Sequence, residues 1–88
     1  MRRWGGYLLD EKEESVNGAL LAPKDYKIAR ALLLARGALV RFEELDKAHG
    51  RVLSKENRWL TISRLREQTG MKIQNIHGRG YRLLPYHL

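Results

Sequence analysis

Four hydrogen-bonding side chains recur at helical spacing in the second half of this 88-residue chain. A helix over residues 55–69 would place them along one face, at positions i, i+4, i+7 and i+11: Asn57, Thr61, Arg64 and Gln68. Amide, hydroxyl and guanidinium groups are the donors and acceptors that read base edges in the major groove of DNA. We therefore expect Asn57, Thr61 and Arg64 to contact bases. The alternative, open to any surface helix, is a solvated polar face without a ligand.

A second candidate site lies in the stretch IHGRGYRLLP at residues 76–85. Gly78 and Gly80 flank Arg79, and strand-forming residues stand on both sides, which predicts a β-hairpin with the arginine at its tip. A narrow minor groove concentrates negative potential and attracts arginine. The hairpin residues expected to contact DNA are His77, Arg79 and Arg82. A surface turn that merely contains an arginine is the alternative.

Positive charge is concentrated in the same part of the chain. The formal net charge is +7, and residues 51–88 contribute +6 of it, with eight Lys and Arg against two acids. A one-sided positive field is typical of a protein with a polyanionic partner. The side chains predicted to contact phosphates are Lys55, Arg58, Arg66 and Lys72.

Other chemistries find little support in the sequence. There is no cysteine, the three histidines (His49, His77, His87) lack metal-ligand spacing, and no nucleophile stands with a base and an orienting group. We therefore expect no enzyme activity, no cofactor and no metal. No apolar run approaches a membrane span or a signal-peptide core, so we expect a cytoplasmic, nucleoid-associated protein without membrane contact.

The elements that must position these side chains follow from apolar spacing and breakers. Short strands are expected over about 4–21, with a turn at Asn17-Gly18, and Pro23 suits the start of a first helix over about 23–36. The residues of that helix expected to be buried are Tyr26, Ala29, Leu32 and Leu33.

The second half is expected to contain two more helices and the hairpin. A short helix over about 42–49 ends at Gly50, and Ser54 caps a third helix over about 55–69. Trp59, Ile62 and Leu65 form the apolar stripe of the third helix, and the hairpin covers about 72–84. Residues 1–88 are thus expected to form one α+β domain, a winged helix-turn-helix with short N-terminal antiparallel strands, three helices and a C-terminal β-hairpin wing.

Two segments resemble a known family. LAPKDYKIARALL at residues 21–33 and ISRLREQTGMKIQNIHGRGYRLL at 62–84 are similar to the OmpR/PhoB-type winged-helix domain, the DNA-binding output module of many response regulators. The resemblance covers residues 19–84 and implies that the third helix enters the major groove while the wing touches the adjacent minor groove. It also implies that the loop near Gly50 to Lys55 is a possible contact for RNA polymerase.

The sequence departs from that family at several positions. Ala22 and Arg41 replace the usual N-capping Thr and Ser, so two caps of about 1 kcal/mol each are missing. Arg58 falls where the family has a buried Val or Ile, so either Trp59 rotates inward in its place or the helix begins in another register. The chain contains no receiver domain, so we expect no control by aspartyl phosphorylation within it.

These observations together predict a stand-alone, sequence-specific binder of double-stranded DNA that regulates transcription. A single module of this kind covers only about 600 to 1,000 Å² of its own surface on DNA, so a homodimer or tandem binding is expected. One alternative is a protein-interaction adaptor that uses the winged-helix fold to bind RNA polymerase or another DNA-associated protein. Another is an RNA binder.

Overall fold

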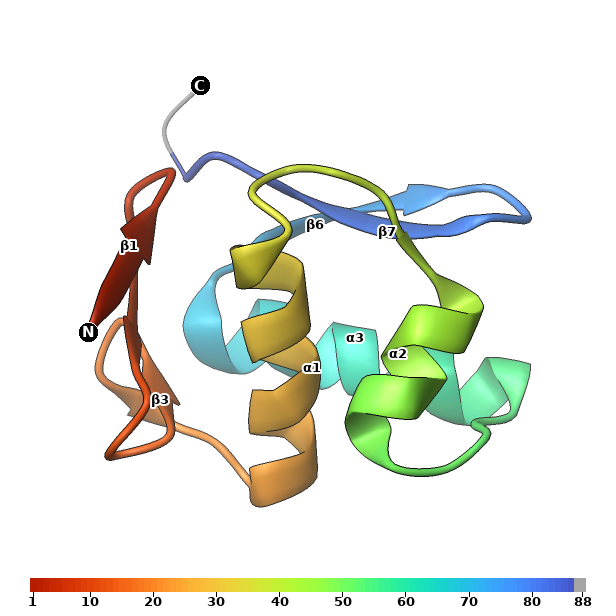
Figure 1. The fold of residues 1–88 in the computed structure, drawn as a ribbon, viewed down its shortest axis with the longest axis horizontal. Coiled ribbons are helices and arrows are strands. Elements are labelled where there is room, and N and C mark those ends of the chain that lie inside the picture. Colours follow the sequence, from red (N-terminus) through yellow and green to blue (C-terminus); the bar gives the residue numbers. More distant parts are fainter. Residues whose placement is uncertain (87–88) are drawn as a thin grey trace.

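Three helices pack together between two small antiparallel sheets (Figure 1). The structure is a computed structural model and describes residues 1–86, so His87, one of the histidines considered as a metal ligand, lies outside the described residues. The helices are α1 (Pro23–Leu34), α2 (Phe42–His49) and α3 (Lys55–Thr69). The second and third match the ranges expected from the sequence, and α1 ends two residues before the expected boundary at 36.

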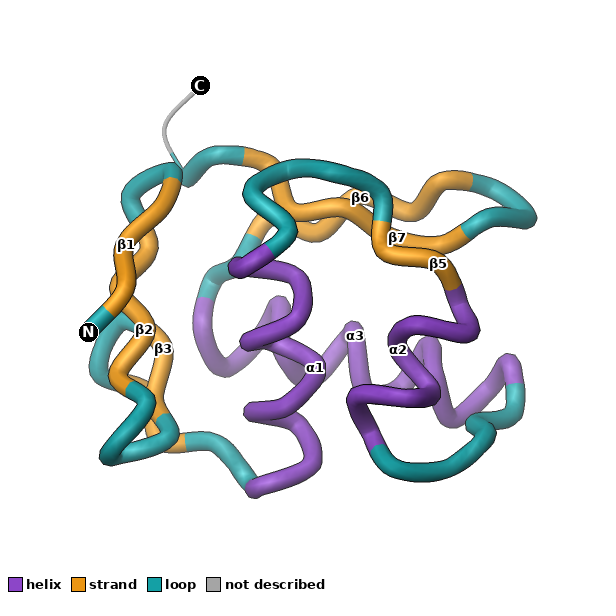
Figure 2. The backbone as a smooth tube through the Cα atoms, in the orientation of Figure 1, coloured by secondary structure: helices purple, strands orange, loops and turns teal. Residues whose placement is uncertain are grey.

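The two sheets lie at different sides of the helices (Figure 2). The N-terminal sheet has the order β1-β2-β3-β4, with the bounds β1 (Arg2–Trp4), β2 (Tyr7–Asp10), β3 (Ser15–Val16) and β4 (Ala19–Leu20). The C-terminal sheet has the order β5-β7-β6, with the bounds β5 (Val40–Arg41), β6 (Lys72–Ile76) and β7 (Gly80–Leu84). The expected wing is the β6–β7 hairpin, which pairs from Lys72 opposite Leu84 to Ile76 opposite Gly80. Strand β5 was not predicted, because two residues are too short to show an alternating pattern.

The hydrophobic core lies between α1, α3 and the inner faces of both sheets. The four residues of α1 that were expected to be buried are buried, and Ile28 joins them. Ile62 and Leu65 of α3 meet this cluster together with residues from both sheets, which include Tyr7, Leu9, Val40 and Leu83. One continuous core therefore fixes α3 and the wing relative to each other.

The helix ends show which caps the sequence supplies. The Ser54 hydroxyl accepts a hydrogen bond from the Asn57 N–H at 3.1 Å, as expected for the N-cap of α3, and Gly50 and Gly70 end α2 and α3 in the left-handed conformation. Ala22 provides no cap. At α2 the Glu44 carboxylate accepts from the Arg41 N–H at 3.4 Å, so half of a capping box survives without the usual Ser.

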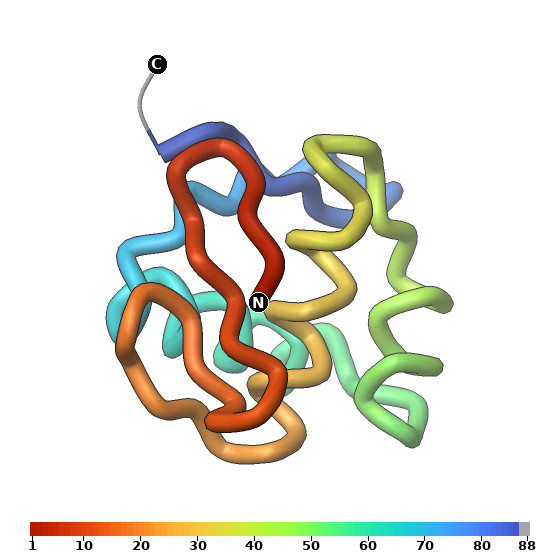
Figure 3. Tube along the Cα trace, turned by 60° about the vertical axis from the view of Figure 1, so that its left-hand side comes forward, coloured from red at the N-terminus to blue at the C-terminus, as the bar shows by residue number. Residues whose placement is uncertain are grey.

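Tyr7 connects the N-terminal sheet to the base of the wing. Its hydroxyl donates to the Leu84 carbonyl at 2.8 Å and accepts from the Lys72 N–H at 2.9 Å, so it touches both wing strands. Burial of the ring raises the pKa of the Tyr7 hydroxyl, which keeps the proton needed for the donated bond. In the turned view, the loop between β1 and β2 reaches the end of β7 (Figure 3), where the Tyr86 N–H donates to the Gly5 carbonyl.

His49 is the buried titratable group at the end of α2. It is 9% exposed, and among the described residues its Nδ1 atom has no hydrogen-bond partner. Burial, and then the positive charges of Lys24 and Arg51, lower the pKa of this imidazole, although Asp25 and Asp46 oppose the effect. We therefore treat His49 as a neutral core residue.

Candidate nucleic-acid interface

The outward face of α3 differs from the face expected from the sequence. Trp59 was predicted to be buried, and this is wrong, because 54% of the residue is exposed. Thr61 was predicted to lie on the outer polar stripe, and this is also wrong, because it is 4% exposed and its hydroxyl donates to the Asn57 carbonyl within the helix. A buried Thr61 is not available to read a base. Asn57 remains exposed at the start of the helix.

Arg58 explains why Trp59 faces outward. The Arg58 side chain is only 13% exposed, although an arginine at this position was expected to face solvent. Its guanidinium bonds the Asp46 carboxylate at 3.2 Å and the Leu53 carbonyl at 3.2 Å, and it lies 4.5 Å from the centre of the Phe42 ring. Arg58 is therefore removed from the residues expected to contact phosphates, because its guanidinium is already bonded to α2 and to the loop before α3.

Arg64 also has a carboxylate partner inside the protein. Its Nε and Nη2 atoms donate to the two oxygens of Asp25 in α1, at 3.2 and 3.0 Å, and Nη2 reaches the Thr61 hydroxyl. This pairing raises the pKa of the guanidinium. Asp25 is buried, whereas 52% of the Arg64 side chain is exposed. Arg64 lies on the α1 flank of the helix, about 140° around the axis from Trp59.

Four other cations of α3 and the wing are not neutralised by a carboxylate of the described residues. Arg66 donates to the Ile73 carbonyl and Arg82 to the Gln74 side chain, and both acceptors are neutral. Lys72 lies 5.9 Å from the centre of the Tyr86 ring. Lys55 is exposed at the first position of α3. Within residues 1–86, none of these four forms an ion pair with a carboxylate.

The two glycines of the wing turn have different functions. Gly78 adopts φ +72°, and the Arg79 N–H donates to the Ile76 carbonyl at 2.9 Å, so Gly78 supplies the positive φ of the turn. Gly80 was expected to do the same, but its φ is not positive. A Cβ at Gly80 would instead collide with the Val40 carbonyl of β5 and lie 2.9 Å from the Arg41 Cα. The turn leaves His77 and Arg79 exposed at its tip.

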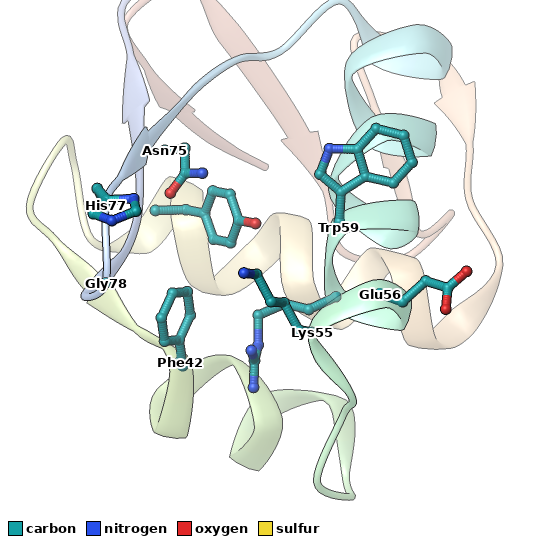
Figure 4. A pocket seen from close by; sticks show the side chains of 9 residues that line it. Phe42, Lys55, Glu56, Trp59, Asn75, His77 and Gly78 are labelled. Carbon is teal, nitrogen blue, oxygen red and sulfur yellow. The ribbon is translucent and has the colours of Figure 1, made fainter.

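A hollow of about 750 Å³ separates the start of α3 from the wing. Figure 4 shows Lys55, Glu56 and Trp59 on its helix side and Asn75, His77 and Gly78 on its wing side. Phe42, Arg58 and Tyr81 complete the lining. The N-terminal half of α3 and the wing therefore border one opening, on the same side of the molecule.

Residues 1–86 contain no group of three or more His, Cys, Asp or Glu side chains that could hold a metal ion. None of their helices has the length and apolar character that a membrane crossing requires.

Comparison with known proteins identifies the fold. No family model matches the sequence, and neither does a curated protein. Among solved structures, the chain is similar to the C-terminal domain of the nisin resistance regulator NsrR, a lantibiotic response regulator. The TM-score is 0.74 with 24% sequence identity, over 93% of this chain and 95% of that chain. The chain therefore has the α+β winged helix-turn-helix fold of a response-regulator C-terminal domain, which confirms the fold expected from its sequence.

Proposed function

We propose that this chain binds double-stranded DNA and regulates transcription, with α3 in the major groove and the wing arginine in the adjacent minor groove. The supporting observation is the hollow that α3 and the wing share, because a duplex placed against it meets both elements at once. The charge distribution agrees, since residues 51–88 contribute +6 to the net charge.

Different residues are proposed to contact the phosphates, the minor groove and the base edges of the DNA. Phosphate contacts come from four exposed cations of α3 and the wing, Lys55, Arg66, Lys72 and Arg82, none of which forms an ion pair within residues 1–86. His77 and Arg79 extend from the wing tip, and Asn57 meets a base edge at the start of α3. Arg64 contributes only through its Nη1 group, because Nε and Nη2 are bonded to Asp25.

The same proposal includes two further partners. A second copy on a repeated site raises the affinity, since a single module covers only about 600 to 1,000 Å² of its own surface on DNA. The loop before α3 presents Val52, which is 84% exposed, beside the buried Leu53. We propose this loop as the surface that meets RNA polymerase.

Selection of bound duplexes from a random pool tests the proposal. We expect one enriched motif whose half-site spacing reports the number of copies bound. Lys55→Gln should weaken binding to that motif, whereas Lys12→Gln, the same charge change in the turn between β2 and β3, should have little effect. Uniform recovery of all duplexes would contradict the proposal and favour the adaptor. Equal competition by duplex RNA would favour the RNA binder, because the narrow major groove of A-form RNA excludes a helix.

A further inference from the structure

The outermost face of α3 is apolar and acidic. Residues 56, 60, 63 and 67 lie opposite the buried Ile62 and Leu65, and they are Glu56, Leu60, Ser63 and Glu67. Leu60 is 40% exposed, and the adjacent Trp59 is 54% exposed on the side of the wing. This face contains no cation, although α3 has three arginines.

The three arginines of α3 are held away from this face. Arg58 is bonded to Asp46 of α2, Arg64 to Asp25 of α1, and Arg66 to the Ile73 carbonyl of β6. Bidentate contact of a guanidinium with guanine is the most frequent specific contact in the major groove. The chain thus directs these groups to its own elements, and the apolar side chains that α3 exposes are Leu60 and Trp59.

The thymine methyl group is the apolar feature that a major groove presents to a protein. We propose that Leu60, extended by Trp59, contacts the 5-methyl groups of thymines and is the main determinant of sequence preference; this inference rests on the proposed function above. Glu56 and Glu67 lie on this face, so DNA is favoured as its occupant by the cations next to it. Lys55 precedes the apolar pair, and the wing beside it carries Lys72, Arg79 and Arg82. An apolar pair that follows Lys55 and lies across the hollow from the wing tip suits a methyl-lined groove whose phosphates meet those cations.

Uracil is a direct test, because deoxyuridine pairs like thymidine and lacks only the methyl group. The probes are the duplex enriched from the random pool and the same duplex with deoxyuridine in place of every thymidine. We expect the wild-type protein to bind the thymine duplex more tightly, by about fourfold for each methyl group contacted. Leu60→Ala should weaken binding to the thymine duplex and should reduce the preference for thymine over uracil.

A matched control uses an exposed leucine of the N-terminal sheet. Leu20 of β4 is 70% exposed on the N-terminal sheet, so Leu20→Ala removes the same atoms far from α3 along the chain. It should discriminate between the duplexes as the wild type does. Circular dichroism checks that both variants keep the fold.

The outcomes separate the inference from the proposed function. Equal wild-type affinity for the two duplexes, with the enriched motif still preferred over random sequence, would refute methyl reading and leave the function standing. Absence of DNA binding would refute both. A Leu60→Ala variant that binds DNA normally but loses binding to purified RNA polymerase would also refute the inference, because the apolar face would then be a protein contact.

Discussion

The salt dependence of DNA binding measures how many cations the protein presents to phosphates. The sequence places seven near α3 and the wing: Lys55, Arg58, Arg64, Arg66, Lys72, Arg79 and Arg82. The structure pairs two of them with carboxylates, Arg58 with Asp46 and Arg64 with Asp25, which leaves five. At about −0.9 per cation, log K should change with log salt with a slope of about −4.5 per copy bound, rather than about −6.3 for all seven.

Fluorescence anisotropy of a labelled duplex, titrated at several salt concentrations, distinguishes these slopes. A rise from 50 to 200 mM salt should weaken binding by about 500-fold for five cations and by about 6,000-fold for seven. Lys55→Gln should reduce the magnitude of the slope by about 0.9, since it removes one unpaired charge. The double variant Asp25→Asn with Arg64→Gln removes a neutral pair and should leave the slope unchanged.

A slope near −6.3 would refute this reasoning. It would show that Arg58 and Arg64 leave their carboxylates when DNA binds. A double variant that loses one unit of slope would point to Arg64 alone. Lys12→Gln is the control for total charge, because it changes the net charge as Lys55→Gln does.

Three further predictions concern the wing and the core. Gly80→Ala should destabilise the fold by about 3 kcal/mol in urea denaturation, because its Cβ meets the β5 backbone. Gly78→Ala should cost only about 1 kcal/mol, because Gly78 lies in open space and only its φ of +72° is unfavourable for alanine. Equal costs for the two variants would contradict this. Arg79→Ala should lose about 1 to 3 kcal/mol of binding, chiefly on sites flanked by A·T pairs, and an equal loss on every sequence would reduce the wing to a phosphate contact. Burial lowers the pKa of His49 below its ordinary 6.5, so the unfolded chain binds a proton at this residue more tightly than the folded protein does. The stability of the fold should therefore be intact above about pH 6.5 and should fall as the pH decreases through that value. His49→Leu should flatten this pH profile, as measured by thermal unfolding.

The boundaries of α2, α3 and the wing were readable from the sequence because local signals define them. Ser54 caps α3, Gly50 and Gly70 end the helices, and the spacing of Ile62 and Leu65 sets the buried face. The resemblance to the OmpR/PhoB-type domain added the relation between helix and wing. These signals lie within a few residues of the elements that they define.

The orientation of side chains on α3 was not readable in the same way. Hydrophobic spacing assigns Trp59 inward and Arg58 outward, but the partners that accommodate a buried arginine, Asp46 and Phe42, lie in another helix. Thr61 is polar by type, yet its hydroxyl bonds the carbonyl of Asn57 one turn earlier and can therefore be buried. Arg64 pairs with Asp25, which lies 39 residues earlier in the chain, so no local sequence pattern predicts this ion pair.

The hydroxyl of Tyr7 joins the N-terminal sheet to both strands of the wing at their root. Because this one atom bonds both strands at their root, the root can open only when the N-terminal sheet separates from it. The tip is held as well, because the Phe42 N–H donates to the Arg79 carbonyl at 3.3 Å and Gly80 pairs with Arg41 of β5. Arg79 is therefore presented from a backbone that is held at both the root and the tip of the wing, while its side chain stays exposed. The first ten residues thus hold the root of the wing through the Tyr7 hydroxyl and through the Gly5 carbonyl, which accepts from the Tyr86 N–H.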